Sequence, residues 1–138
     1  MRITILPFAA LMLATLCCTS EKTPVDLADP FVGTGFHGHT YPGATAPGGM
    51  VQLSPDTRNR TWDGSSGYHY SDSTIMGFSH THLSGTGCAD LGDFLFTPAI
   101  GDVTTGEKGF EIAPLAFSHS DELASPGYYR VRFPDPGI

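Results

Sequence analysis

The chain has 138 residues, and its 14 acidic side chains outnumber its 7 lysines and arginines, which gives a formal net charge of −7 at pH 7. Because nucleic-acid binding proteins neutralise phosphates with basic side chains, this balance argues against a nucleic-acid partner. A hydrophobic fraction of 40% with only 15% charged residues predicts a folded domain and excludes a wholly disordered chain.

Residues 1–18 have the pattern of a signal peptide. Arg2 is the only charged residue in this segment, and an apolar run covers residues 5–16. The run is too short to span a bilayer but suits the hydrophobic core of an export signal. The adjacent Cys17 and Cys18 indicate a bacterial lipoprotein, in which one of them would carry a lipid and provide the only membrane contact. Ordinary secretion, with both cysteines removed, stays open as the alternative.

A single domain is expected after the leader. Residues 19–24 are polar and predict a tether, and residues 25–138 follow as the domain. The 17 glycines and 11 prolines of the chain are spread out and indicate many turns between short strands. Cys88 is the only cysteine of this domain, so an intrachain disulfide framework within it is excluded.

Four segments have strand patterns, and no long helical period is present. The strands are predicted at residues 50–54, 74–82, 94–100 and 127–133. The segment at 94–100 is a continuous apolar run, which is typical of a buried strand. One helical turn is expected at residues 121–124, before Pro126. The pattern predicts an all-β protein, an antiparallel β-sandwich.

Alternation assigns faces to two of these strands. In the last strand, Tyr129, Val131 and Phe133 share one face, and Arg130 and Arg132 share the other. In residues 74–82, Met76 and Phe78 are expected to pack in the core, and the two histidines of that face are expected to reach a cleft.

Two His-x-His pairs, at residues 37–39 and 80–82, are the candidates for chemistry. On a strand, His80 and His82 would lie on one face, close enough to share a metal ion. A metal site would need a further ligand, and the candidates are His37, His39, His69, Cys88, Asp90 and Asp93. None of the stronger zinc spacings is present, so a structural role and contact with a sugar hydroxyl stay open beside the metal site.

Trp62, the only tryptophan, is followed by Asp63. An indole stacks on the apolar face of a pyranose, and a carboxylate accepts hydrogen bonds from the hydroxyls of the sugar. The alternative is that Trp62 is a core or interface anchor.

The glycine-rich residues 33–44 predict a loop at the rim of a ligand cleft. Since no helix follows them, a phosphate site is excluded. Asp90 and Asp93 are spaced for a turn or a cation and do not predict a glycosidase acid–base pair.

Three runs together resemble the N-terminal domain of glycoside hydrolase family 92. They are DPFVGTGFHGHTYPGATAPGGMVQLSPDTR, WDGSSGYHYSDSTIMGFSHTHLSGTGCADLGDFLFTPAIGDV and FSHSDELASPGYYRV. The resemblance covers residues 25–133. The family consists of exo-acting α-mannosidases, best known in Bacteroidota. The sequence departs from the family pattern at Gly48–Gly49, where Pro-Phe-Gly is usual, and at Ser65, where a cysteine is common.

The resemblance implies a fold and a reaction. A β-sandwich packs on an (α/α)6 catalytic barrel, which hydrolyses terminal α-mannosides of N-glycans or mannan with inversion and with calcium. The acid, the base and the calcium ligands come mainly from the barrel. This chain is therefore expected to contain no catalytic residue, metal site or cofactor of its own.

The resemblance also implies a site, a location and a boundary. The substrate-binding candidates carried over from the family motifs are Arg58, Trp62, Asp63, His80 and His82. The protein is expected in the periplasm or at the cell surface of a Gram-negative bacterium. We expect a truncated domain, since the sandwich is incomplete and the barrel is absent, and a chain that is inactive alone. A free-standing carbohydrate-binding surface module is the alternative.

Overall fold

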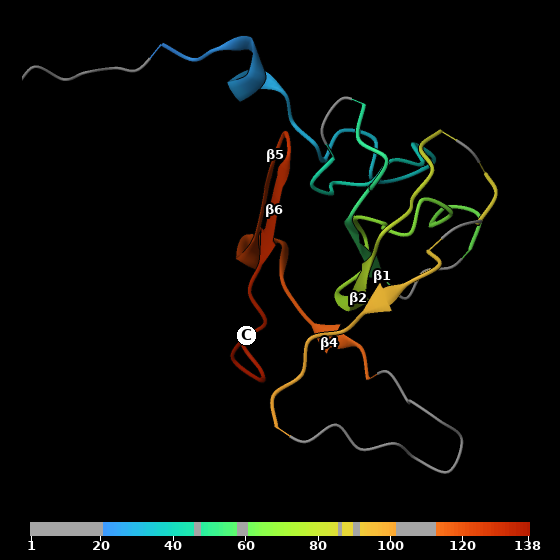
Figure 1. The fold of residues 1–138 in the computed structure, drawn as a ribbon, viewed down its shortest axis with the longest axis vertical. Coiled ribbons are helices and arrows are strands. Elements are labelled where there is room, and N and C mark those ends of the chain that lie inside the picture. The colour runs from blue at the N-terminus through green and yellow to red at the C-terminus, as the bar shows by residue number, and fades with distance from the viewer. Residues whose placement is uncertain (1–20, 46–47, 58–60, 86, 90–91, 102–112) are drawn as a thin grey trace, which may run out of the picture.

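The computed structural model describes residues 21–138 except 46–47, 58–60, 86, 90–91 and 102–112. Six short strands and two single turns of 3-10 helix, η1 (Pro24–Leu27) and η2 (His119–Asp121), lie in this part of the chain (Figure 1). The strands are β1 (Ser54–Thr57), β2 (Thr74–Ser79), β3 (Leu95–Phe96), β4 (Leu115–Ala116), β5 (Glu122–Ser125) and β6 (Tyr128–Val131). None of the helical turns described here is long and apolar enough to cross a membrane.

Some predictions concern residues outside the described part of the chain. These are the leader at residues 1–18 with Cys17 and Cys18, the substrate-binding candidate Arg58, and Asp90. They remain predictions.

The main sheet is built around β2, and all of its pairings are antiparallel. β1 pairs with one edge of β2, and β3 and β4 share the other edge, at opposite ends of the strand. The β1–β2 register shifts where Asp56 faces Gly77 and Thr57 faces Ile75, so Met76 is an extra residue on β2. Such a bulge bends the strand and changes which side chains point inward.

The second sheet is the β5–β6 hairpin, in which Ser125 pairs with Tyr128. The connection between them is Pro126–Gly127. Proline fixes the backbone of the first turn position, and Gly127 takes the left-handed conformation, with φ +77°, that the second position of a type II turn requires. The predicted alternation of residues 127–133 is confirmed, because Phe133 is buried and Arg130 is exposed.

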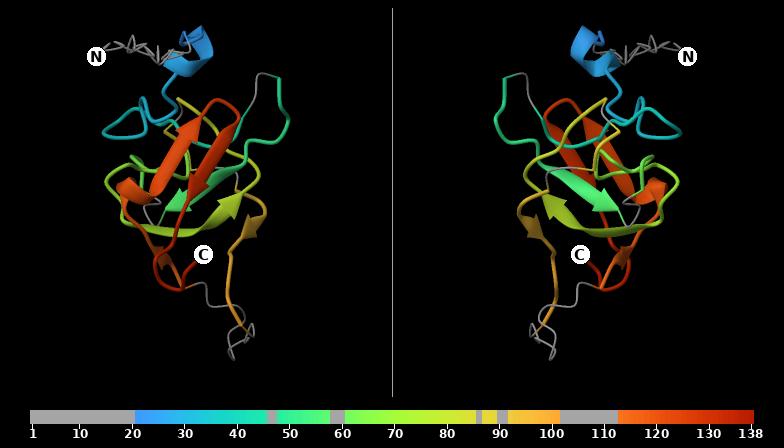
Figure 2. Two further views of the ribbon diagram at one scale, coloured as in Figure 1. Left: turned by 90° about the vertical axis from the view of Figure 1, so that its left-hand side faces the viewer. Right: turned by 90° about the vertical axis from the view of Figure 1, so that its right-hand side faces the viewer.

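One core joins the two sheets. It consists of Tyr68, Ile75, Phe117 and Phe133, with Phe31, Tyr41, Phe78, Leu115 and Val131 packed around it. Phe78 of β2 and Tyr129 of β6 contact across the layers with ring centroids 6.3 Å apart. Figure 2 shows the hairpin crossing over the main sheet. The predicted fold class, antiparallel all-β with two packed layers, is confirmed.

A buried carboxylate also ties the hairpin to the rest of the domain. The side chain of Glu122 is almost completely buried, and it accepts hydrogen bonds from Tyr68 Oη (2.8 Å), Tyr129 Oη (2.5 Å) and His119 Nδ1 (2.5 Å). Burial, and then the interactions with Glu122, raise the pKa of Tyr68 and Tyr129. Both phenols therefore remain donors at neutral pH.

The faces of β2 differ in part from the expectation, although Phe78 packs against the core as expected. Ile75, Gly77 and Ser79 are its buried residues, whereas Met76 and Phe78 are only half-buried. The small side chains are buried because neighbours approach closely there. A Cβ at Gly77 would lie 2.6 Å from the carbonyl oxygen of Phe96. A period of two identifies the faces of a strand but does not tell which one is covered.

The strand expected at residues 50–54 is wrong except for its last residue. Met50 is almost fully exposed, and β1 instead runs through Pro55, Asp56 and Thr57. These residues look unsuitable for a buried strand, but internal partners satisfy their side chains. Asp56 Oδ2 accepts from the backbone N–H of Ser79 at 2.8 Å, and Thr57 Oγ1 donates to the carboxylate of Asp72.

Two further predictions are corrected. The apolar run at residues 94–100 forms only the two-residue strand β3, and Phe94, Phe96 and Ile100 are exposed. The helical turn lies at His119–Asp121, capped by the Ser118 side chain, and residues 122–125 form β5 instead of continuing it. The inward Glu122 network favours the extended chain there.

Candidate functional site

Trp62 and Asp63 lie on a surface turn between β1 and β2. The backbone N–H of Ser65 donates to the Trp62 carbonyl, which closes the turn. The indole is 56% exposed. The carboxylate of Asp63 accepts a short hydrogen bond from His37 Nδ1, and both side chains are partly exposed. Since an ionised carboxylate only accepts, Nδ1 of His37 is the donor of this hydrogen bond.

The loop of residues 33–44 supplies three more rings to this surface, and two of them contact Trp62. The His37 and Trp62 centroids are 4.8 Å apart, and His39 meets the indole edge-to-face at 4.5 Å. Phe36 lies against His37, with centroids 4.0 Å apart. We call Phe36, His37, His39, Trp62 and Asp63 the Trp62 cluster. The loop expected at the rim of a cleft therefore contacts the expected sugar platform directly.

His39 is the buried member of the cluster. It is only 7% exposed, and its Nε2 has no hydrogen-bond partner among the described residues. Its backbone is in the left-handed region, with φ +52°. A buried ring nitrogen without a partner and a non-glycine residue at positive φ are both uncommon, and they tend to occur at functional sites.

The chain that follows β2 also reaches this cluster, at Gly87. A Cβ placed on Gly87 would lie 2.1 Å from the indole Nε1 of Trp62, so only glycine fits beside the ring as it stands. Cys88, which follows, is exposed and free. The segment after β2 thus helps to place the tryptophan.

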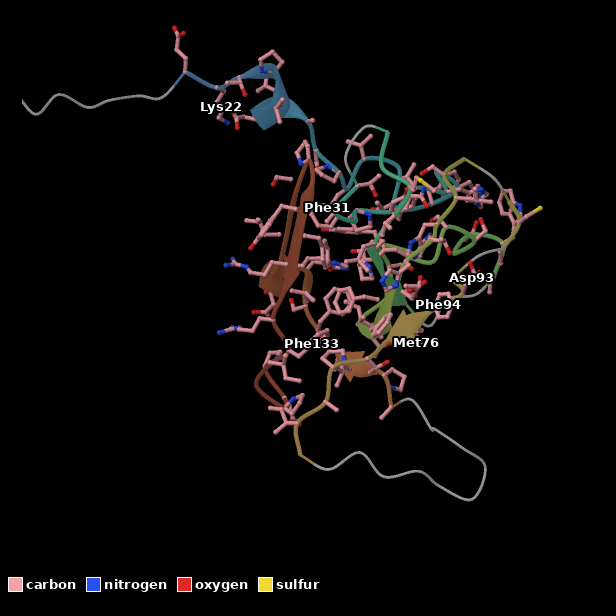
Figure 3. All side chains as sticks on the ribbon, in the orientation of Figure 1. Lys22, Phe31, Met76, Asp93, Phe94 and Phe133 are labelled. Carbon is pink, nitrogen blue, oxygen red and sulfur yellow. The ribbon has the colours of Figure 1, made fainter. Side chains whose placement is uncertain are left out.

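His80 lies elsewhere, beside β3. Its ring meets Phe96 edge-on with centroids 4.9 Å apart, and Nδ1 is 3.4 Å from the Phe94 carbonyl oxygen. Figure 3 places Asp93 and Phe94 together at the side of the main sheet away from the β5–β6 hairpin. Asp93 Oδ2 accepts from Thr81 Oγ1 at 3.0 Å, which fits a turn-forming role. The structure does not bring His80 to the Trp62 cluster.

His82 is buried between β1 and β2. Its Nδ1 donates to the Gln52 carbonyl at 2.6 Å, and Nε2 lies 3.0 Å from Ser79 Oγ and 3.1 Å from Asp56 Oδ1. Of the interpretations left open for this residue, the geometry favours the structural one. Its contact with a sugar, like that of His80, stays a prediction.

The sequence matches a known domain over nearly all of the described part. The description of the match is "Glycosyl hydrolase family 92 N-terminal domain", and it covers residues 27–138. The chain belongs to glycosyl hydrolase family 92. The family predicted from the three sequence runs is therefore confirmed.

Two solved family GH92 structures and one secreted glycosidase are similar to parts of this sequence. A family GH92 α-mannosidase from Bacteroides thetaiotaomicron, solved in complex with mannoimidazole, is 48% identical, with a TM-score of 0.69 over 80% of this chain and 15% of that one. A family GH92 inverting mannosidase from Bacteroides thetaiotaomicron VPI-5482 is 33% identical, with a TM-score of 0.58, over 83% of this chain and 16% of that one.

An uncharacterized secreted glycosidase from Arthroderma benhamiae (strain ATCC MYA-4681 / CBS 112371) is 30% identical over 129 residues, which is 88% of this chain and 16% of that protein. The chain therefore spans only about a sixth of the length of these relatives.

In this family 92 domain, sequence reasoning had not connected His37, His39 and Phe36 to Trp62. The His-x-His pair within a glycine-rich loop was a signal in the sequence for this site. It did not indicate Trp62 as the neighbour, because 26 positions separate His37 from Asp63. In the described part of the chain, no three His, Cys, Asp or Glu side chains come together as a metal site.

Proposed function

We propose that this chain is the N-terminal part of an exported, exo-acting α-mannosidase, and that the Trp62 cluster forms one wall of its sugar pocket. The observation that supports this most directly is the half-exposed indole of Trp62 beside the Asp63–His37 pair. It occurs in a family 92 domain whose 48% identical relative was solved with mannoimidazole bound.

The cluster has the chemistry that a pyranose requires. The exposed indole offers an apolar face to the C–H groups of the ring. The Asp63 carboxylate accepts hydrogen bonds from sugar hydroxyls, and Nε2 of a neutral imidazole such as His37 can do the same. Arg58, His80 and His82 stay proposed substrate-binding residues on the family motifs alone.

The rest of the reaction belongs to the larger part of the enzyme. We infer an inverting hydrolysis of terminal α-mannosides, with acid and base carboxylates and calcium ligands in an (α/α)6 domain beyond this chain. Calcium would polarise the sugar hydroxyls it binds, and this chain would supply the stacking surface. The inferred stereochemistry is supported by the 33% identical relative, which is an inverting mannosidase.

Export is also proposed. The apolar run at residues 5–16 and the name of the secreted glycosidase from Arthroderma benhamiae support it. Attachment through a lipid on Cys17 or Cys18, and a periplasmic or cell-surface location in a Gram-negative bacterium, rest on the leader sequence and the family. Mass spectrometry of the purified mature N-terminus tests the lipid directly.

Two assays of the purified chain test the proposal. The first is hydrolysis of an aryl α-mannoside, for which we expect no turnover, since the catalytic carboxylates lie elsewhere. Robust turnover by the chain alone would refute this division of labour. The second is binding of methyl α-mannoside, followed by calorimetry and amide chemical shifts, because Trp62→Ala removes the only tryptophan and with it any emission signal. We expect weak, millimolar binding that is lost in Trp62→Ala.

The free-standing binding module is the second candidate function. The exposure of Trp62 favours it as well, because an uncovered indole can bind sugar without a partner domain. Binding of mannan by the purified chain at micromolar concentration would favour the module over the pocket wall.

A further inference from the structure

Phe36 is an exposed aromatic side chain whose presence on the surface needs an explanation. It is 79% exposed, more than Trp62, and it belongs to the same cluster. The ring of His37 contacts both Phe36, at 4.0 Å, and Trp62, at 4.8 Å. The Phe36 and Trp62 centroids are therefore at most about 9 Å apart, and the polar His37–Asp63 pair adjoins both rings.

The backbone holds Phe36 in this position. Its φ is +52°, in the left-handed region that an aromatic residue seldom occupies. The Phe36 carbonyl oxygen accepts from Nε2 of the buried His69 at 3.1 Å. His69 Nδ1 in turn accepts from the hydroxyl and the backbone N–H of Ser71, at 2.8 and 3.2 Å, so the tautomer that donates to Phe36 is fixed. An exposed ring on a backbone held by a buried histidine is a preorganised contact.

We propose that Phe36 is a second aromatic platform, which binds the sugar unit next to the one that stacks on Trp62. The site then accepts α-mannosides of at least two pyranose units, with the Asp63 and His37 acceptors facing the hydroxyls between the two platforms. This inference rests on the proposed sugar-binding function of Trp62 and deepens it. It assigns a specificity to Phe36 that the family motifs did not suggest.

The composition of the surface favours a carbohydrate over an apolar peptide. Two exposed rings alone would suit either ligand, but a carboxylate and an imidazole adjoin them. An apolar side chain placed there would take water from the Asp63 carboxylate and leave it with His37 alone as a donor, whereas a sugar hydroxyl donates to it. Stacking faces combined with hydroxyl acceptors are what an oligosaccharide uses.

The test compares a monosaccharide with a disaccharide on the same chain. Methyl α-mannoside and α-linked mannobioses are titrated into the purified chain, and binding is followed by tryptophan emission and by amide chemical shifts. We expect the best mannobiose to bind about fivefold or more tighter than the monosaccharide. Phe36→Ala should remove this gain and leave monosaccharide affinity within about twofold.

A matched control separates the platform from a general effect of losing an exposed phenylalanine. Phe94 is 69% exposed and lies beside β3, outside the Trp62 cluster. Phe94→Ala should leave both affinities unchanged. If Phe36→Ala disturbs the loop, amide shifts far from the sugar site reveal it. Phe36→Leu, which keeps an apolar side chain but no ring, then serves as the test variant and should also lose the gain.

The outcomes distinguish the two proposals. Equal affinity of the wild-type chain for mono- and disaccharide, or an equal loss of both in Phe36→Ala, overturns the role of Phe36. If Trp62→Ala keeps full monosaccharide affinity, the proposed function of Trp62 fails. If the folded chain binds neither sugar at millimolar concentration, both proposals are refuted for this chain.

Discussion

At the scale of single residues, Gly67 shows how closely the interior is packed around the buried His82–Asp56 pair. A Cβ on Gly67 would lie 2.6 Å from Asp56 Oδ1 and 2.6 Å from His82 Cδ2, and the glycine has φ +90°. A side chain here would therefore strain the backbone and push apart two side chains that hold β1 to β2.

Replacing this glycine tests that packing. We expect Gly67→Ala to lower the free energy of unfolding by about 2–4 kcal/mol, measured by urea denaturation. Gly85→Ala is the matched control, because Gly85 also has a left-handed φ, of +76°, but a Cβ there meets nothing within 4 Å. The control should cost only about 1 kcal/mol, from backbone strain alone. Equal losses in the two variants would show that the contact with His82 and Asp56 is unimportant.

Single residues also show how much of the candidate site could be predicted from the sequence. Trp62 and Asp63 were singled out by their chemistry as a candidate for sugar binding, with a core or interface anchor as the alternative, since an indole beside a carboxylate suits a sugar wherever it lies. His37 was not connected to them, because the approach of two loops 26 positions apart depends on the whole fold. His82 looked like a cleft residue, yet its polar partners allow it to be buried.

At the scale of elements, Glu122 explains how a short hairpin is held against a separate sheet. Its carboxylate accepts from Tyr68 on the main-sheet side, from Tyr129 on β6 and from His119 in η2. No backbone pairing between the hairpin and the main sheet is found among the described strands. The side-chain network and the shared core therefore carry this connection.

The two phenols predict how stability depends on pH. Burial is the largest cause that raises the pKa of Tyr68 and of Tyr129, followed by their interactions with Glu122. In the unfolded chain, tyrosine titrates near pH 10. Because the folded-state pKa is the higher one, this stabilisation is complete below about pH 10 and is lost as the pH rises above it. Each tyrosine should lower the free energy of unfolding by about 1.4 kcal/mol per pH unit there.

Urea denaturation between about pH 8 and about pH 11 measures this slope. Tyr129→Phe should reduce it by about half, because one of the two shifted phenols is gone. Tyr128→Phe is the control, since Tyr128 is the neighbouring residue on β6 but points to the exposed face. A slope that Tyr128→Phe changes as much as Tyr129→Phe would contradict the role of the buried network.

Among the elements, those with one covered face were predicted best. Residues 127–133 alternate because Tyr129 and Phe133 face the core and Arg130 faces water. The buried strand predicted at residues 94–100 was wrong, because an apolar stretch has the same composition whether it is buried or lies at a sheet edge. β1 was missed because its buried polar residues depend on partners distant in sequence.

At the scale of the whole molecule, net charge and exposed apolar side chains have opposite effects on the association of copies of the chain. The chain carries −7 at pH 7, and its sequence pI is about 5.1. Repulsion between copies keeps such a chain dispersed at neutral pH and fades as the pH falls toward the pI. β3 is an edge strand of the main sheet, and it presents Phe96, 61% exposed, with Phe94 beside it.

Unpaired sheet edges with exposed aromatic side chains template association between copies. We therefore expect light scattering of the purified chain to rise as the pH is lowered toward about 5. Phe96→Lys should suppress this rise, because it places a charge on the edge strand. Val25→Lys adds the same charge at a residue that is 60% exposed on η1, away from the sheets, and should suppress it much less. If both lysine variants behave alike, the net charge alone governs association; if only Phe96→Lys remains dispersed, the β3 edge is the contact between copies.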